Sequence, residues 1–562
     1  MLSFANAWGS SILKRGAGGP GEGRANILEK SKINITMALE LRVPTERVAP
    51  PKDLEIRPKQ ARAWVESLPL SHSMESGRKI LANLCAVNRA KVEFDDRLQL
   101  YECYRPIAHV IFDELDAVYG KALLPLPAKA REALGLAREL AMEFGYGYKT
   151  LILEKTGKLL AFGAKKQMPF LVHRAMESLV QLLRASYRSY TPIPAGTWRE
   201  IHLLYLHAEK EGFLNEPAEP ETKASIADLY AENLLVALTD PYRLVPGDLD
   251  RITQLIRTQR GAWTLGQARP QTRPGGHFLV PCDQDKPPKP LLSANDDPGG
   301  PNWRLLDANP IVEKLRARRQ AVETGNVSAT TSKAMGPEMV ALLTKLVALW
   351  GDPPKRTSRR DPMDTSVAIC AGMRAITHFV SIEPRIDPAK EKQAIESGIT
   401  IPLVFVPDDE VSKGMSVSEW DVVNQSAGGL KVRRIGTHAT AITVGEVLGI
   451  KFMGKPTWTV GVVRWLTMLD EGGMEFGIQF LAPAARCVAV QPTISAAGQV
   501  RPGLLLSEGE SFEEADTLLT GPATYSDLRE FEIEDEGFVS RVRATSLIER
   551  TGRFDLFHFA AS

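Results

Sequence analysis

Four basic residues stand together in one short segment of this sequence. Residues 355–360 read KRTSRR and hold Lys355, Arg356, Arg359 and Arg360. A guanidinium binds phosphate through a planar fork of donors, stacks on flat rings and pairs with O6 and N7 of guanine. Because neighbouring cations repel one another, the segment favours an anionic partner. The alternative interpretation is a solvated charge cluster on a linker.

A second polar segment follows, between two predicted strands. Residues 420–432 read WDVVNQSAGGLKV, with Asn424, Ser426, Gly428 and Gly429 at the joint. A plain hairpin needs only a turn residue or two. Asn and Ser add small hydrogen-bonding groups, and the glycines permit backbone conformations and close approaches that other residues do not. The segment therefore predicts a polar bend that grips a flat, hydrogen-bonding molecule.

Motifs of catalysis and metal binding are absent from the sequence. It contains no G-x-x-x-x-G-K-[ST], no H-E-x-x-H and no G-x-S-x-G. The segment GIKFMGKP has Pro456 where a phosphate-binding loop needs Ser or Thr. The nine histidines are scattered and the five cysteines form no C-x-x-C pair, so we expect neither a metal site nor a disulfide framework. These features predict a protein that is not an enzyme and needs no cofactor.

The elements that must position the two polar segments begin with a helical region, residues 57–262. In TPIPAGTWREIHLLYLHAEKEGFL, Thr197 and Glu200 have the spacing of a capping box. Apolar residues from Trp198 to Ala208 then follow helical periodicity. Similar segments separated by Pro, Gly and Asn predict helical hairpins, arranged as a short solenoid or as a plain bundle.

The pattern then changes from helix to strand. Residues 263–336 are rich in Pro and Gly and predict an irregular connector with short strands, followed by a helix over 337–352. Many short strands over 353–495 predict a small antiparallel β-barrel, with an insertion at about 385–415. Residues 500–562 predict a further β extension. The fold class is thus multidomain α+β, a helical half followed by a barrel.

The composition of the chain argues against a general affinity for nucleic acid or membranes. The 562 residues carry a net charge of +1, so no global field favours nucleic acid or a membrane surface. The longest apolar runs are too short to span a bilayer, and the scattered cysteines fit a reducing cytoplasm. We interpret residues 1–50 as a disordered tail, with Met37 as an alternative start.

The arginine cluster followed by N-x-S-x-x-G resembles the PilZ domain family. That family pairs an R-x-x-x-R segment, matched here by Arg356 and Arg360, with a [D/N]-x-S-x-x-G segment, matched by Asn424, Ser426 and Gly429. The later strands WTVGVVRWL and EFGIQFL are similar to the closing strands of such barrels. The resemblance covers roughly residues 350–490 and leaves the helical region without a family.

The resemblance implies a bacterial effector that binds cyclic di-GMP. Arg356 and Arg360, assisted by Arg359 or Lys355, would bind phosphate and guanine. Asn424 and Ser426 would form hydrogen bonds to the ligand from the other side. The helical region would then pass the signal to a protein partner. The 64 positions from Arg360 to Asn424 are more than is usual for the family. The alternatives are a scaffold protein with a degenerate barrel and, disfavoured by the near-neutral charge, an RNA-binding protein.

Overall fold

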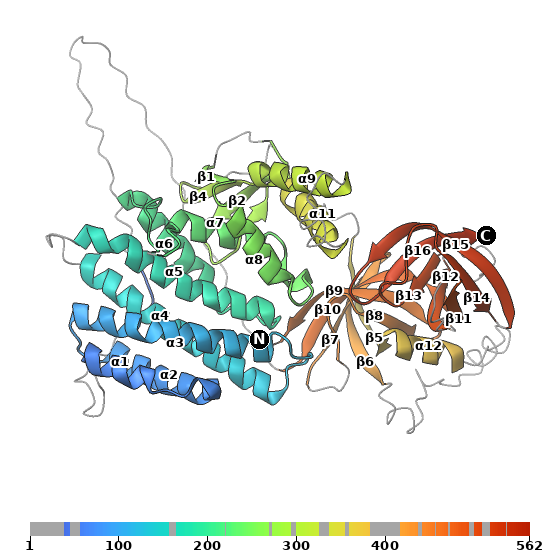
Figure 1. Cartoon of the computed structure of the whole chain (residues 1–562), viewed down its shortest axis with the longest axis horizontal. Helices are drawn as coiled ribbons and strands as arrows, with labels where there is room; N and C mark the ends of the chain where they lie inside the picture. Colours follow the sequence, from blue (N-terminus) through green and yellow to red (C-terminus); the bar gives the residue numbers. More distant parts are fainter. Residues whose placement is uncertain are drawn as a thin grey trace, which may run out of the picture. The chain divides into compact units, whose positions relative to one another are not determined.

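A computed structural model gives the fold of the chain (Figure 1). It describes residues 39–44, 57–156, 164–219, 221–268, 273–293, 299–324, 337–353, 359–382, 416–436, 441–455, 457–469, 472–493, 500–507, 517–535 and 537–562. The predicted tail and the predicted insertion at about 385–415 lie almost wholly outside these ranges. No helix in the described ranges has both the length and the apolar character that a bilayer crossing requires.

The first half is helical, as predicted. Helix α4 packs against both α3 and α5, and its buried face carries residues such as Leu140, Phe144 and Tyr148. The helices are α1 (Pro58–Glu66), α2 (Ser73–Arg89), α3 (Phe94–Tyr119), α4 (Ala128–Thr156), α5 (Ala164–Arg188), α6 (Thr197–Glu211), α7 (Ile226–Ala237) and α8 (Asp248–Thr258).

The predicted capping box at the start of α6 is wrong. Gly196 occupies the N-cap in a left-handed conformation (φ 88°), and no side chain caps the helix. Glu200 instead accepts two hydrogen bonds from the ammonium group of buried Lys149, at 2.9 and 3.1 Å. The Glu200 side chain pairs with Lys149 instead of capping the helix, because leaving a buried ammonium group without a partner costs more free energy than leaving a helix end uncapped. A true capping box joins Ser225 and Asp228 at α7.

A small sheet and two helices follow the helical region. Strands β1 (Thr264–Gln267), β2 (His277–Pro281), β3 (Lys289–Pro290) and β4 (Trp303–Asp307) form an antiparallel sheet in the order β1-β4-β2-β3. Helix α9 (Asn309–Glu323) then packs against α11 (Pro337–Gly351). Trp350 of α11 is fully buried, and its indole donates to the Leu235 carbonyl of α7 at 3.1 Å. The sheet and helices are thereby tied to the helical region.

The predicted antiparallel barrel is present and closed, in the order β10-β7-β6-β5-β8-β9. Inside it, the ring of Trp420 meets Phe476 edge-on with centroids 4.8 Å apart, and both side chains are fully buried. Its strands are β5 (Asp361–Ala371), β6 (Val417–Ser426), β7 (Gly429–Arg434), β8 (Val447–Phe452), β9 (Thr459–Met468) and β10 (Met474–Ala482).

The C-terminal residues form more than an extension, because they close into a second barrel (Figure 1). Helix α12 (Met373–Ile382) packs against strands of both barrels, and its Phe379 stacks on Trp458 of the first with centroids 5.7 Å apart. One apolar core therefore joins the two barrels. The second barrel contains β11 (Ala484–Pro492), β12 (Arg501–Ser507), β13 (Thr517–Thr520), β14 (Glu530–Asp535), β15 (Phe538–Arg550) and β16 (Asp555–Ala561).

Candidate functional site

Strand register brings the arginine segment to the polar bend. At the start of β5, Asp361 pairs with Gln425 and Pro362 pairs with Asn424. Arg360 immediately precedes β5 and therefore lies at the barrel end where β6 turns into β7. At the other end of the same strand pair, Cys370 pairs with Val417. The chain between the two segments thus leaves and returns at the opposite end, and the long interval does not separate them in space.

The arginines of this segment face solvent where the structure describes them. Arg359 and Arg360 are both exposed. Arg359 forms an ion pair with Asp361 at 3.4 Å, and the Arg359 side chain is 92% exposed. A pair this exposed contributes little stability, so it leaves the guanidinium available to a ligand. The predicted ligand residue Arg356 and its neighbour Lys355 lie outside the described residues.

The polar residues of the bend share the outer face of the barrel. Residues that face each other in an antiparallel pair point to the same side of the sheet. Asn424 pairs with Lys431, and Ser426 pairs with Gly429. The intervening Leu430 is buried inside the barrel. Asn424 and Ser426 therefore point outward together, beside the strand that follows the arginines.

Gly429 is required by the neighbouring strand. A Cβ at this position would lie 2.1 Å from the backbone oxygen of Ile478 in β10. Gly428 has no atom within 4 Å of the corresponding position, although its carbonyl accepts a hydrogen bond from Phe480 at 3.0 Å. The two adjacent glycines thus differ: the first lies in open space and the second permits close approach of a backbone.

We expect Gly429→Ala to destabilise the first barrel by about 2 kcal/mol, because the new methyl group must push β10 away. Gly428→Ala is the matched control and should unfold at nearly the wild-type denaturant concentration. The measurement is denaturant unfolding of the full chain, followed by circular dichroism. Equal midpoints for the two variants would contradict the steric role of Gly429.

Sequence reasoning missed an aromatic residue on the same outer face. Of the two tryptophans in WTVGVVRWL, Trp458 is buried. Trp465 is only partly buried and covers Gly477 of β10, where a Cβ would lie 1.9 Å from the indole nitrogen. The Lys431 ammonium lies 5.8 Å from the Trp465 ring centroid. The glycine inside strand EFGIQFL was the signal for this close approach.

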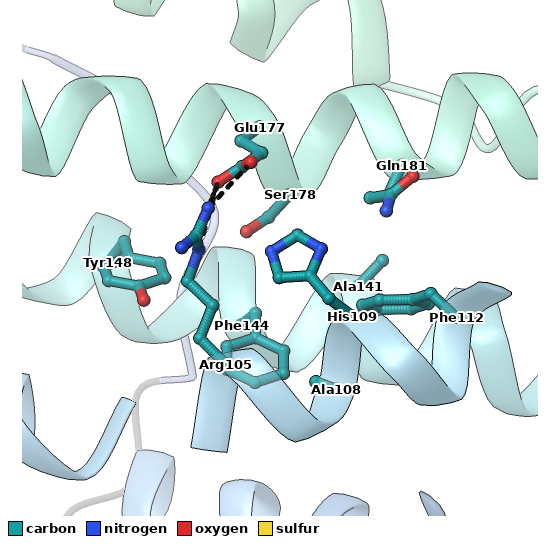
Figure 2. Close-up of a pocket in the computed structure, with 10 residues that line it drawn as sticks. All are labelled: Arg105, Ala108, His109, Phe112, Ala141, Phe144, Tyr148, Glu177, Ser178 and Gln181. Carbon is teal, nitrogen blue, oxygen red and sulfur yellow. Dashed lines mark hydrogen bonds and ion pairs between the residues drawn. The ribbon is translucent and has the colours of Figure 1, made fainter. Parts of the chain in front are cut away.

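A small cavity lies between helices α3, α4 and α5 of the helical region (Figure 2). Its volume of about 20 Å³ holds roughly one water molecule. Binding sites for drug-sized ligands are typically larger by more than tenfold, so this cavity is no nucleotide site. Its walls are Arg105, Ala108, His109, Phe112, Ala141, Phe144, Tyr148, Glu177, Ser178 and Gln181.

Beside this cavity, three side chains on α5 and the loop before α7 have a metal-like arrangement. Potential ligand atoms of His173, Glu177 and Glu219 all lie within 4.8 Å of one another. Arg105 already binds Glu177 at 3.0 Å, and Arg174 binds Glu219. A cation would be repelled by both guanidiniums, and burial lowers the pKa of His173. We therefore interpret the cluster as a structural ion-pair network.

A closed barrel with arginines before its first strand and N-x-S-x-x-G between the next two defines a PilZ-type module. Family models give the same class and extend it over the chain. The model for the N-terminal domain of the cyclic-di-GMP receptor FimW matches residues 59–269. The model for its middle PilZ domain matches 277–397 and 406–487, and the model for its C-terminal β-barrel domain matches 488–562.

The chain belongs to the FimW family. One relative, the cyclic-di-GMP receptor FimW of Pseudomonas aeruginosa, is 23% identical, and the alignment covers 94% of each chain. The resemblance drawn from motifs reached only residues 350–490 and left the helical region unassigned. The family also includes that region and the second barrel.

Proposed function

We propose that this chain is a bacterial receptor for cyclic di-GMP and that it binds the ligand at the β6–β7 end of the first barrel. The observation that carries the proposal is the register of β5 and β6, which sets Pro362 opposite Asn424. The similar protein from Pseudomonas aeruginosa is named for the same ligand. No cofactor is needed for this binding.

The ligand has two phosphates and two guanines, and the site offers a group for each. Arg356, Arg359 and Arg360 bind phosphate oxygens or stack on guanine. Asn424 and Ser426 donate and accept hydrogen bonds from the outer face of the barrel. Gly429 keeps β7 close to β10, so that these groups stay on one surface.

Binding is transmitted along the arginine segment. Helix α11 ends at Gly351 and β5 begins at Asp361, and both ends are anchored. Buried Trp350 holds the first end to α7, and the barrel holds the second. A ligand bound by the arginines fixes the segment between two folded bodies, and binding thereby acts as a switch between two states of the chain. The helical region then presents its surface to a protein partner.

The five cysteines are free thiols, which supports placing the receptor in a reducing cytoplasm. Their wide spacing in the sequence was the basis of the same expectation. The remaining alternative is a scaffold protein of the same family that acts through its helices whether or not nucleotide is present.

Calorimetric titration of the full chain with cyclic di-GMP tests the proposal, with GTP as the comparison ligand. We expect saturable binding of cyclic di-GMP alone, together with slower proteolysis between residues 351 and 361 when the ligand is bound. A folded chain that binds no cyclic di-GMP would overturn the proposal in favour of the scaffold. Binding without any change in proteolysis would overturn only the switch.

A further inference from the structure

A glutamine on β10 stands beside the proposed nucleotide site. Gln479 pairs directly with Gly429, the last residue of the N-x-S-x-x-G segment. It is exposed, whereas the preceding Ile478 is buried inside the barrel. Its side chain therefore shares the outer face with Asn424 and Ser426. A carboxamide there offers both hydrogen-bond donors and an acceptor.

An arginine on β9 fixes the orientation of this carboxamide. Arg464 is the extra residue of a β-bulge, since Gly477 pairs with Trp465 and Ile478 with Val463. A bulge re-aims the side chain that it carries. The Nε–H of Arg464 donates to Oε1 of Gln479 at 2.7 Å. The amide oxygen is thus turned toward Arg464, and the planar geometry puts the amide nitrogen on the side away from it.

The second barrel holds this arginine in place. Glu549 of β15 accepts hydrogen bonds from Nη1 and Nη2 of Arg464 at 2.5 and 2.7 Å. The Arg464 and Glu549 side chains are only 30% and 25% exposed. A bidentate pair at this burial restricts the guanidinium to one geometry. The orientation of Gln479 therefore depends on a residue from the second barrel.

Orientation decides which base a glutamine recognises. A free carboxamide pairs with adenine, accepting from N6 and donating to N7. With its oxygen engaged by Arg464, Gln479 presents N–H donors, which match the O6 and N7 acceptors of guanine. Phosphate, by contrast, is the natural partner of the nearby arginines.

We propose that Gln479 reads guanine in the bound nucleotide and that Arg464 and Glu549 are positioning residues that set its amide. The inference rests on the proposed function and assigns selectivity to residues outside both sequence motifs. It also makes the second barrel a part of the nucleotide site.

The test is titration of the full chain with cyclic di-GMP and with cyclic di-AMP. Losing one hydrogen bond should make Gln479→Ala about tenfold weaker for cyclic di-GMP. Arg464→Met should lower the preference for cyclic di-GMP over cyclic di-AMP about fivefold, with no further effect in the Gln479→Ala background. Arg464→Lys keeps a donor and should retain most of the preference. Gln320→Ala, on the exposed face of α9, is the control and should bind as wild type.

The outcomes separate this inference from the function on which it rests. A folded wild type that binds neither nucleotide overturns both. If the wild type binds cyclic di-GMP and Gln479→Ala keeps the same affinity and the same preference over cyclic di-AMP, only the inference is overturned. If Arg464→Met weakens binding equally in both backgrounds, Arg464 acts on the ligand itself and its positioning role is wrong.

Discussion

Arg360→Ala and Asn424→Ala should each weaken cyclic di-GMP binding strongly, and the double variant should show almost none. Removing a charge-assisted bond to phosphate costs about 2 kcal/mol, which is roughly a thirtyfold loss for Arg360→Ala. Loss of the neutral side chain of Asn424 should cost about tenfold. The two residues belong to different segments, so a loss in both variants would show that the site is assembled from both.

Calorimetry of the full chain measures these affinities. Arg501→Ala is the matched control, because it removes an exposed arginine from β12 of the second barrel. It should bind as wild type, since it changes net charge equally but lies on another barrel. Wild-type affinity in both Arg360→Ala and Asn424→Ala, with unchanged circular dichroism, would exclude this end of the barrel as the site.

Trp350→Ala should destabilise the joint between α11 and the helical region by about 4 kcal/mol, because it leaves a large cavity and removes an indole donor. Trp350 has no exposed surface and bonds to the Leu235 carbonyl. Denaturant unfolding of the full chain, followed by circular dichroism, would show an early transition.

Trp350→Phe separates packing from hydrogen bonding in this joint. It keeps most of the apolar volume but leaves the Leu235 carbonyl without its donor, so we expect a loss of about 1–2 kcal/mol. If Trp350→Ala unfolded at the wild-type denaturant concentration, the anchoring of the arginine segment at this end would be wrong, and with it the proposed route of transmission.

Much of the fold could be predicted because its helices and strands follow from patterns of neighbouring residues. Periodic apolar residues predicted the helices, and short alternating strands predicted the first barrel. The capping box at Thr197 failed because sequence spacing does not reveal that Glu200 must neutralise buried Lys149. Closure of the second barrel was missed, since pairing of β11 with β14 joins residues far apart in the chain.

In the candidate site, too, some residues could be predicted from local sequence and others could not. Asn424, Ser426 and the arginines formed motifs that the sequence displays directly. Gln479 belongs to no motif, and only the pairing of β7 with β10 places it beside Gly429. Glu549 is more distant still, because a different barrel supplies it. Residues that act through register or through contacts between domains leave no local pattern in a single sequence.

The packing of helix α12 against both barrels affects whether either barrel can fold without the other. Its Phe379 lies in one apolar core with Val462 of the first barrel and Leu504 of the second. Cutting the chain between β10 and β11 would expose this core to water, and apolar patches of that kind promote aggregation. The barrels therefore form one cooperative folding unit. We expect an isolated PilZ-type module from this chain to aggregate unless the C-terminal barrel covers this core.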